Sequence, residues 1–307
     1  MSFYSLFASK GPSGFGYTST AKEVTAGLSL EGKTILVTGC NSGLGQEAVR
    51  VLTGRGARVV ATARSAEKAE AACRSFSGKT IPLACELAEP ASVRACVEAV
   101  KQKGITLDAI IGNAGIMALP KLRQAYGYEL QFFTNHIGHF ILITGLLEQL
   151  AADGRVVMLS SSAHRMAPGG GIEFDNLSGE KRYWSWRAYG QSKFANLLFA
   201  KELARRFAGT KKTANAVHPG SINTNLTRHM GTVSTFFADH FGPLFLKSVS
   251  QGAATEVFAA VHPAAAGING AYFDDCNVAK CRRDADDPVL AKKLWDVSER
   301  IVAELKI

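Results

Sequence analysis

The feature that most constrains the fold is a regular alternation of short apolar runs with longer stretches of helical spacing. Most of the short runs are apolar on both faces, which is typical of parallel strands buried on both sides of a sheet. A short strand near 270–273 and a helix over 288–304 end the pattern. The remaining predicted strands are 33–38, 57–62, 80–84, 107–112, 155–160 and 214–218, and the remaining predicted helices are 43–55, 66–76, 90–102, 127–149 and 184–207.

Strands that alternate with helices along a chain form right-handed βαβ units. The expected fold is therefore α/β, a doubly wound parallel sheet with helices on both faces. No internal repeat or linker divides the pattern, so we predict one domain over 31–307, preceded by an N-terminal arm over 1–30.

One segment, 225–250, interrupts the alternation and is rich in phenylalanine and leucine. It follows the predicted strand 214–218, and ligands of open α/β sheets bind beyond the carboxyl ends of the strands. We favour a lid over an apolar substrate, and the alternative is a helix packed on the core. The apolar residues concerned are Phe236, Phe237, Phe241, Leu244, Phe245 and Leu246.

A glycine-rich turn lies between the first predicted strand and the first predicted helix. Gly39 permits a tight turn, Gly43 lets the backbone approach a pyrophosphate, and Gly45 lets the helix pack close to the sheet. The free N–H groups and the dipole of a helix N-terminus attract an anion there. The turn predicts a Rossmann-type dinucleotide site formed by Thr38, Gly39, Asn41, Ser42, Gly43, Leu44 and Gly45.

The end of the second predicted strand indicates which dinucleotide binds. NAD sites place an acidic residue there to bind the ribose 2′-hydroxyl, but this strand runs into Ala63 and Arg64 without an acid. A guanidinium suits a 2′-phosphate, so we expect NADPH in preference to NADH. The alternative for Arg64 is a surface arginine at the end of the strand.

A candidate catalytic pair lies in the predicted helix 184–207. Tyr189 and Lys193 are four residues apart and therefore share a helix face. A cation beside a phenol lowers the pKa of the phenol, and such a pair can exchange a proton with an alcohol oxygen. Further polar residues follow other strands at the same carboxyl edge of the predicted sheet: Asn113, Ser160, Ser161, Ser162 and the stretch 219–224, with Asn135 in the helix after Asn113.

These motifs, in this order, resemble the short-chain dehydrogenase/reductase family over nearly the whole chain, from Thr20 to the last helix. The resemblance implies that Tyr189 is the acid/base and that Lys193 binds the nicotinamide ribose. It further implies that Ser161, rather than Ser160 or Ser162, polarises the substrate oxygen, and that Asn135 supports a water linked to Lys193. Cofactor contacts implied or expected elsewhere are Arg64, Leu87, Asn113, Ala114, Gly115, Tyr189, Lys193, Pro219, Gly220, Ile222 and Thr224.

The resemblance is closest to the retinol dehydrogenase and WW-domain oxidoreductase branch. The shared stretches are 19–24, 135–140, 160–164 and 189–193. No WW domain is found, and the N-terminal membrane-anchoring helix of microsomal retinol dehydrogenases is missing. One departure is Glu86, which stands where the family usually has Asp before Leu87. Glutamate is one methylene longer, which puts an adenine contact by its side chain in doubt.

Composition narrows the classes of partner and compartment that are expected for this chain. The net charge of +9 indicates a solvated basic surface, with attraction to a phosphorylated cofactor as a second interpretation. No run of Lys or Arg exceeds two residues, so nucleic acid is not an expected partner. The six cysteines form no CxxC motif and are expected to be reduced thiols in the cytoplasm. No membrane span is expected, and the oligomeric state stays open, although homo-oligomers are usual in the family.

Three histidines and two tryptophans are further candidates for a role in the chemistry. His136 and His139 could bind a metal at their spacing, but no third ligand accompanies them, so we expect packing or surface histidines and no metal. Trp184 and Trp186 either shape the mouth of the site or lie in a surface loop. We expect His164 to pack in the core or a loop rather than to contact substrate.

The sequence thus predicts an NADPH-preferring oxidoreductase that acts on a carbonyl or alcohol of an apolar substrate, such as a retinoid-, steroid- or aromatic-like ketone or aldehyde. Two alternatives remain. One is a non-catalytic NADP-binding scaffold that senses redox state, and the other is an NAD-linked alcohol dehydrogenase of the same fold.

Overall fold

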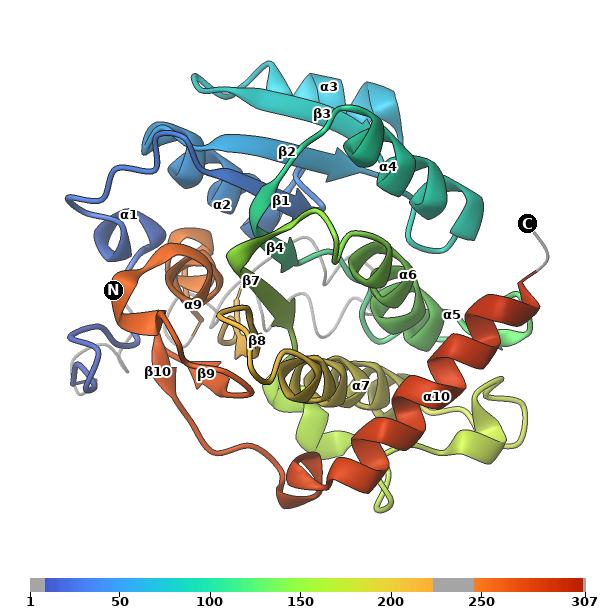
Figure 1. Cartoon of the computed structure of the whole chain (residues 1–307). Helices are drawn as coiled ribbons and strands as arrows, with labels where there is room; N and C mark the ends of the chain where they lie inside the picture. Colours follow the sequence, from blue (N-terminus) through green and yellow to red (C-terminus); the bar gives the residue numbers. More distant parts are fainter. Residues whose placement is uncertain (1–8, 223–245, 306–307) are drawn as a thin grey trace.

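The computed structural model describes residues 9–222 and 246–305, and within them eight strands form one sheet (Figure 1). The strand order is β10-β9-β8-β7-β4-β1-β2-β3, and all neighbours are parallel except β9 and β10. The predicted doubly wound α/β fold is confirmed. The strands are β1 (Thr34–Thr38), β2 (Arg58–Ala63), β3 (Thr80–Ala84), β4 (Leu107–Gly112), β7 (Leu150–Leu159), β8 (Thr213–His218), β9 (Tyr272–Asp274) and β10 (Asn277–Val278).

Helices cover both faces of the sheet, and each face has its own hydrophobic core. The first face carries α1 (Ala21–Val24), α2 (Gly43–Gly54), α3 (Ala66–Cys73) and α9 (Val249–Val261). The second face carries α4 (Pro90–Gln102), α6 (Gly138–Gly145), α7 (Ser185–Arg206) and α10 (Pro288–Glu304). The strands between them are buried on both sides, as their near-continuous apolar sequences predict; every residue of β1 is buried.

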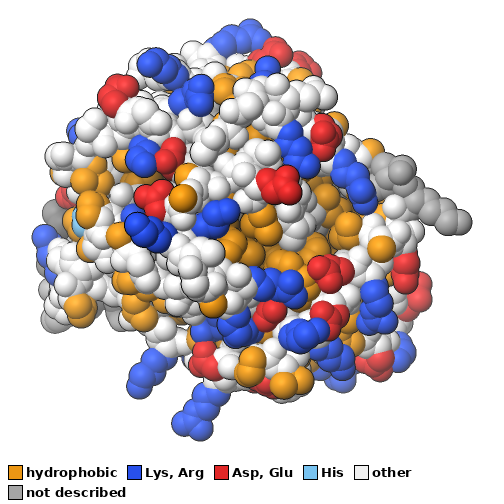
Figure 2. Space-filling view, in the orientation of Figure 1, with side chains coloured by type: hydrophobic (Ala, Val, Ile, Leu, Met, Phe, Trp, Pro, Cys, Tyr) orange, Lys and Arg blue, Asp and Glu red, His pale blue; other side chains and the backbone are white. Residues whose placement is uncertain are grey.

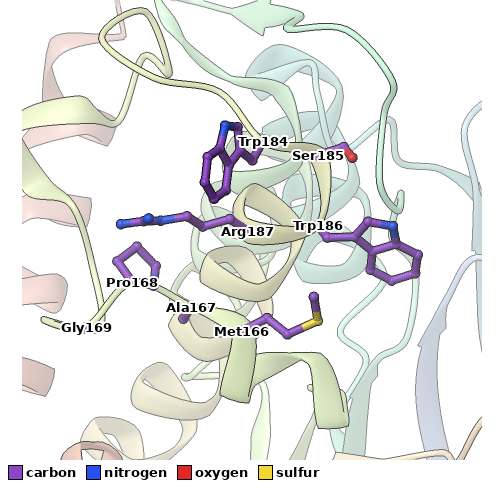
Figure 3. A pocket seen from close by; sticks show the side chains of 8 residues that line it. All are labelled: Met166, Ala167, Pro168, Gly169, Trp184, Ser185, Trp186 and Arg187. Carbon is purple, nitrogen blue, oxygen red and sulfur yellow. The ribbon is translucent and has the colours of Figure 1, made fainter.

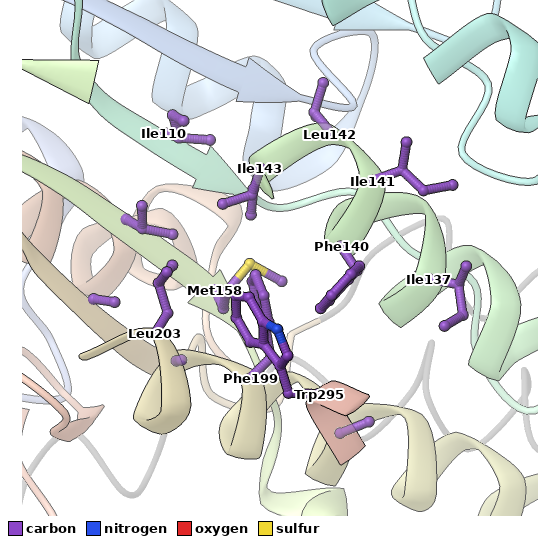
Figure 4. Packing of buried hydrophobic residues seen from close by; sticks show 14 of the residues in the cluster. Ile110, Ile137, Phe140, Ile141, Leu142, Ile143, Met158, Phe199, Leu203 and Trp295 are labelled. Atoms are coloured by element: carbon purple, nitrogen blue, oxygen red, sulfur yellow. The ribbon is translucent and has the colours of Figure 1, made fainter. Parts of the chain in front are cut away.

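Aromatic packing fixes the position of α7, the helix that carries the candidate catalytic pair (Figure 4). The rings of Phe140 and Phe199 lie 5.0 and 5.6 Å from that of Trp295, which joins α6, α7 and α10. The guanidinium of Arg206 lies 3.8 Å from the Trp295 ring centroid. Burial of each large apolar side chain contributes roughly 1.5–3 kcal/mol, so this cluster holds α7 firmly against the sheet.

The helix predicted over 127–149 is wrong as a continuous element. Its start is part of a two-stranded hairpin, β5 (Gln124–Ala125) with β6 (Tyr128–Glu129). The helix then begins as α5 (Leu130–Phe132), passes through a π-helical turn at Phe133–Ile137, and continues as α6. Apolar periodicity alone did not reveal the insertion of a π turn, which adds a residue to the helical ladder.

The N-terminal arm and the predicted lid are both only partly described. Residues 9–30 lie on the domain, because Asn277 of β10 accepts from Ser13 N (3.0 Å) and donates to Phe15 O (3.0 Å), and α1 packs against α9. Most of the predicted lid, 225–245, lies outside the described residues, as does Thr224. The end of that predicted lid is the start of α9, whose N-terminus is closed by a reciprocal capping box between Ser248 and Gln251.

Candidate active site

The glycine-rich turn after β1 has the geometry that a dinucleotide site requires. Gly39 has φ +76°, and a Cβ on Gly45 would lie 2.3 Å from Gly39 O and 2.5 Å from Asn113 Nδ2. The side chain of Ser42, the N-cap residue of α2, makes no capping hydrogen bond, so it leaves the first amides of α2 to another acceptor. Backbone approach and uncapped amides together fit a pyrophosphate.

The turn is tied to the end of β4 by hydrogen bonds. Asn113 Nδ2 donates to Thr38 O at 2.7 Å, and Ala114 N donates to Thr38 Oγ1 at 2.9 Å. Thr38 is buried and its hydroxyl is used inside the protein. Its part in the predicted cofactor site is therefore to hold the turn in place.

His139 extends this tie to Asn135. Its Nδ1 lies 2.9 Å from Asn135 O, a carbonyl that can only accept, so Nδ1 carries the proton. Burial lowers the pKa of His139 to about 4, so the ring is neutral and Nε2 accepts from the Thr38 hydroxyl at 3.0 Å. His139 was expected to be a packing or surface residue. It is buried, and it links the glycine-rich turn to the π-helical turn that carries Asn135.

Ser161 is the serine that meets Tyr189. The Ser161 side chain lies beside the Tyr189 hydroxyl, where its hydrogen bonding lowers the pKa of Tyr189, whereas Ser160 Oγ donates to Lys193 O at 2.8 Å and is buried. Ser162 is exposed. The Ser161 carbonyl accepts from Nδ1 of the buried His164 at 2.6 Å, which fixes the backbone at this serine.

Tyr189 and Lys193 lie together on one face of α7, as their spacing predicts. Lys193 Nζ is 5.8 Å from the Tyr189 ring centroid and donates to Leu159 O at 3.1 Å, at the carboxyl end of β7. Burial raises the pKa of Tyr189 to about 12, and the Ser161 hydrogen bond opposes this shift. The expected lowering of the Tyr189 pKa is therefore wrong for these side chains alone. Burial also lowers the pKa of Lys193 to about 8.

Asn135 and Gly115 complete the surroundings of Lys193. A Cβ on Gly115 would lie 2.9 Å from Asn135 Oδ1 and 3.4 Å from Lys193 Nζ. Asn135 Oδ1 accepts from Ile116 N at 2.8 Å, and its Nδ2 donates to Ser192 Oγ at 2.9 Å. The π-helical turn thus places Asn135 beside the lysine, and the ends of β4 and β7 meet there.

A buried carboxyl that the sequence gave no reason to single out lies behind this centre. Glu256 of α9 is fully buried, and neither carboxyl oxygen has a hydrogen-bond partner among the described residues. Burial raises the pKa of Glu256 to about 8, and the charge of Lys193 opposes this rise. Local sequence carries no signal for such a group, because its burial arises from the packing of α9 on the sheet.

The turn after β8 reaches the glycine-rich turn. Ile222 and Leu44 both pack over Gly252, where a Cβ would lie 2.4 and 2.7 Å from their methyl carbons. Gly220 has φ +87° and leaves room for the buried Lys247 side chain, which pairs with Asp275. Pro219 and Gly220 are partly exposed beside this pair.

The remaining predicted cofactor residues lie at the ends of β2 and β3. Arg64 is exposed, and within residues 9–222 and 246–305 it has no ion pair. Glu86 turns back on its own loop, where its carboxylate accepts from Ala88 N at 3.3 Å. Leu87 is buried, with its carbonyl 2.3 Å from where a Cβ on Gly138 would lie.

Comparison with known proteins agrees with this arrangement. Residues 33–233 match the family model for short chain dehydrogenases. The chain belongs to the short-chain dehydrogenase/reductase family. It is 40% identical to the short-chain dehydrogenase TIC 32 B, chloroplastic, of Brassica napus over 99% of this chain and 100% of that protein. It is 38% identical to retinol dehydrogenase 14 of Homo sapiens over 90% of this chain and 88% of that protein. The predicted family and its retinol dehydrogenase-like branch are confirmed.

Solved structures of the family superpose on the chain. A protein of Mycobacterium paratuberculosis is 33% identical with a TM-score of 0.75, and the match covers 91% of this chain and 97% of that one. A short chain dehydrogenase of Burkholderia cenocepacia in complex with NADP is 25% identical with a TM-score of 0.64, over 80% and 97% of the two chains. As a family member, this short-chain dehydrogenase/reductase is an oxidoreductase that uses a nicotinamide cofactor on CH–OH or C=O groups of small molecules.

A groove of about 490 Å³ opens between the start of α7 and the chain that follows the 3₁₀ turn Ser162–Met166 (Figure 3). Both tryptophans that the sequence analysis singled out line it, so they shape a concavity rather than a flat loop. The lining residues are Met166, Ala167, Pro168, Gly169, Trp184, Ser185, Trp186 and Arg187.

Three further features of this family member are its surface charge, its cysteines and the hydropathy of its helices. Figure 2 shows Lys and Arg interspersed with Asp and Glu over one face, which agrees with a solvated basic surface. All six cysteines are free. In the described part of the chain, no helix is long and apolar enough to cross a bilayer, and no three His, Cys, Asp or Glu side chains are grouped as metal ligands.

Proposed function

We propose that this enzyme is an NADPH-preferring oxidoreductase that moves a hydride between the nicotinamide and a carbonyl or alcohol carbon of an apolar substrate. Retinoid-, steroid- or aromatic-like ketones and aldehydes are the expected substrate class. One observation carries the proposal: Tyr189 lies with Lys193, and beside Ser161, at the sheet edge that also holds the glycine-rich turn.

Residues of this chain fit the parts of the cofactor. The glycine-rich turn and the first amides of α2 would hold the pyrophosphate, Lys193 the nicotinamide ribose, and Arg64 the 2′-phosphate. When bound, the nicotinamide supplies the hydride that attacks the carbonyl carbon, or accepts it in the reverse direction.

The proton is handled by the side chains. In the reduction direction, Ser161 and Tyr189 bind the carbonyl oxygen, and Tyr189 Oη gives it the proton while the carbon receives the hydride. A Tyr189 pKa of about 12 keeps the phenol protonated at neutral pH, which is the form a proton donor needs. Lys193, whose pKa is about 8, is mostly cationic at neutral pH and stabilises the phenolate that remains. At neutral pH these side chains are therefore in the protonation states that the reduction direction uses.

Several observations support the finer points. No acid follows β2, Arg64 is exposed there, and one similar structure is a complex with NADP. The phenylalanine-rich stretch 235–246 favours an apolar substrate. Six free thiols suit a reducing compartment such as the cytoplasm.

Tyr189→Phe tests the proposal. Loss of a general acid lowers kcat by about 10²–10⁴-fold, and we expect that loss with a panel of carbonyls and NADPH, with cofactor affinity changed by less than about threefold. Tyr126→Phe is the matched control, since Tyr126 is 49% exposed and outside the site. If Tyr189→Phe kept its turnover, the mechanism would be wrong. Tight NADPH binding with no turnover of any carbonyl by the unmodified protein would instead support the redox-sensing scaffold.

A further inference from the structure

Two buried histidines flank the peptide group that joins Ser161 to Ser162. The carbonyl of this group, Ser161 O, lies 2.6 Å from His164 Nδ1. Its N–H, on Ser162, donates to His218 Nδ1 at 3.2 Å. His164 is fully buried and His218 is 8% exposed. Both polar atoms of one peptide group are therefore bonded to histidine side chains, directly after the serine that we propose binds the substrate oxygen.

The place of Ser162 in the chain explains why its N–H needs a partner. Ser162 opens the 3₁₀ turn Ser162–Met166, and the first N–H groups of a helical turn have no partner within that turn. The Ser161 side chain accepts from Ala163 N at 3.2 Å, so it serves the second N–H of the turn and not the first. His218 supplies the acceptor for the first. With Ala163 N donating to Ser161 Oγ, the hydroxyl proton of Ser161 stays available for a substrate oxygen.

The two hydrogen bonds require opposite tautomers of the two rings. A carbonyl only accepts, so Nδ1 of His164 carries the proton, and its Nε2 accepts from Arg282 N at 3.3 Å. A backbone N–H only donates, so Nδ1 of His218 is unprotonated and Nε2 carries the proton. Burial lowers the pKa of both histidines, that of His218 to about 4, so both rings are neutral at pH 7.

Each histidine is held by a different part of the fold. His218 is the last residue of β8 and pairs in register with Asp274 of β9. The ammonium of the buried Lys247 further disfavours a positive charge on the His218 ring. His164 lies in the 3₁₀ turn, and its ring meets the Tyr272 ring edge to face with centroids 5.0 Å apart. The N–H of the peptide group is thus tied to β8, and its carbonyl is tied through His164 to β9.

We propose that His164 and His218 form a clamp that fixes the orientation of Ser161, one ring donating to the peptide group that follows this serine and the other accepting from it. The orientation of that peptide group sets the ψ angle of Ser161, and with it the direction in which the Ser161 side chain leaves the backbone. The inference rests on the role that the proposed function gives to Ser161. His164 and His218 are positioning residues, because they act through this serine rather than on the substrate.

Histidine-selective NMR tests the clamp without any substrate. In the protein labelled with ¹³C and ¹⁵N at its seven histidines, the ring shifts at pH 7 should show His164 as the neutral Nδ1–H tautomer and His218 as the neutral Nε2–H tautomer. His164→Asn and His218→Asn identify the two sets of signals. Either ring in the opposite tautomer, or either ring charged at pH 7, would overturn the clamp and leave the proposed function untouched.

Turnover of naphthaldehyde with NADPH tests what the clamp does. We expect His218→Leu, which removes the acceptor, to lower kcat by about 10–100-fold, since misplacing a catalytic group by about 1 Å can cost about 100-fold. NADPH affinity should change by less than about threefold. His218→Asn should restore most of kcat, because asparagine Oδ1 takes the place of Nδ1. His218→Gln should not, because its amide lies one bond further out. Equal kcat in the leucine and asparagine variants would contradict the clamp.

A double-mutant cycle with Ser161→Ala separates positioning from a general loss of structure. Adding His218→Leu to Ser161→Ala should lower kcat by less than about threefold more, because the group that the clamp positions is already gone. If His218→Leu does not fold, as judged by thermal unfolding, His218→Gln takes its place. Multiplication of the two single losses would overturn the proposal.

His262→Leu is the matched control for the loss of such a hydrogen bond. His262 Nδ1 also accepts from a backbone N–H at the start of a 3₁₀ turn, that of Ala264 at 3.0 Å. This variant should lower the temperature of thermal unfolding and leave kcat unchanged. A loss of kcat in His262→Leu as large as that in His218→Leu would show that the effect is not specific to the peptide group after Ser161, and would overturn the clamp.

Discussion

The cofactor half and the catalytic half of the site are built by different means. Around β1 and α2, the proposed cofactor binding rests on the backbone: Gly39 has φ +76°, Gly45 leaves no room for a Cβ, and the Ser42 side chain does not cap α2. Around α7, the proposed catalysis rests on buried side chains whose pKa values move with burial, upward for Tyr189 and downward for Lys193. The first half depends on local geometry, and the second depends on which elements cover it.

This difference decides which kind of substitution damages each half of the site. A backbone site is damaged by added volume and is nearly indifferent to charge. A buried side-chain site is sensitive to any change that moves a proton or a charge within a few ångströms. Added volume therefore tests the cofactor half, and a change of buried charge tests the catalytic half.

The largest expected effect comes from added volume in the backbone half. Gly45→Ala places a Cβ 2.3 Å from Gly39 O and 2.5 Å from Asn113 Nδ2, so the turn must move. We expect a loss of about 3 kcal/mol or more in the free energy of unfolding and at least about 100-fold in NADPH affinity. Thermal unfolding and fluorescence titration with NADPH measure these.

Gly54→Ala is the matched control in the same helix, because a Cβ there meets nothing within 4 Å. It should leave NADPH affinity unchanged and stability equal or slightly higher, since alanine is the better helix former. Wild-type NADPH affinity in Gly45→Ala would show that the turn does not carry the pyrophosphate.

The backbone half was also the half that the sequence predicted best. The predicted bounds of β3, β4 and α4 agree with the structure, and Arg64 is exposed directly after β2. Continuous apolar strands and turn glycines are local signals, so they can be read without knowing the tertiary fold. The order of Tyr189, Lys193 and Asn135 along the chain was likewise readable, and the structure brings these three together.

What the sequence did not predict depends on tertiary packing. Helix α9 was missed, because the predicted lid ended at 250 and no element was predicted between it and the strand near 270, although the Ser248–Gln251 capping box was a usable signal. The π turn at Asn135, the link through His139 and the burial of Glu256 have no local signature. The upward shift of the Tyr189 pKa also follows from burial, which a pattern of residue types does not measure.

Glu256→Gln is the next test, and it probes charge in the catalytic half. A carboxyl whose pKa is raised from 4.5 to about 8 binds a proton more tightly in the folded than in the unfolded state. Its contribution to stability is therefore full below about pH 4.5 and is lost as pH rises through about 8. Glu256→Gln should remove a decline of about 2 kcal/mol between about pH 6 and pH 7.5, measured by urea unfolding at each pH.

Glu202→Gln is the control for that slope. Glu202 is also nearly buried, but it accepts from Arg205 and Arg206 at 3.0 Å each. Its loss should lower stability by a similar amount at every pH in this window. If Glu256→Gln kept the wild-type slope, Glu256 would have to be ionised in the folded protein and paired through a contact that the described residues do not show.

The smallest effect is expected from Arg64, whose side chain would make a single contact to the cofactor. Arg64→Ala should weaken NADPH binding by about tenfold, or about 1.4 kcal/mol, because an exposed guanidinium loses part of its phosphate interaction to solvent and salt. NADH affinity should be unchanged, since NADH has no 2′-phosphate, and the loss of NADPH affinity should shrink as salt is added.

Arg74→Ala is the matched control, because Arg74 lies at the end of α3 with a side chain 75% exposed. An unchanged NADPH-to-NADH ratio in Arg64→Ala would leave the missing acid after β2 as the sole support for NADPH. A wild-type protein that already preferred NADH would favour the NAD-linked dehydrogenase. Either result would show that Arg64 does not decide the choice between NADPH and NADH, whereas pyrophosphate binding by the turn after β1 is tested separately by Gly45→Ala.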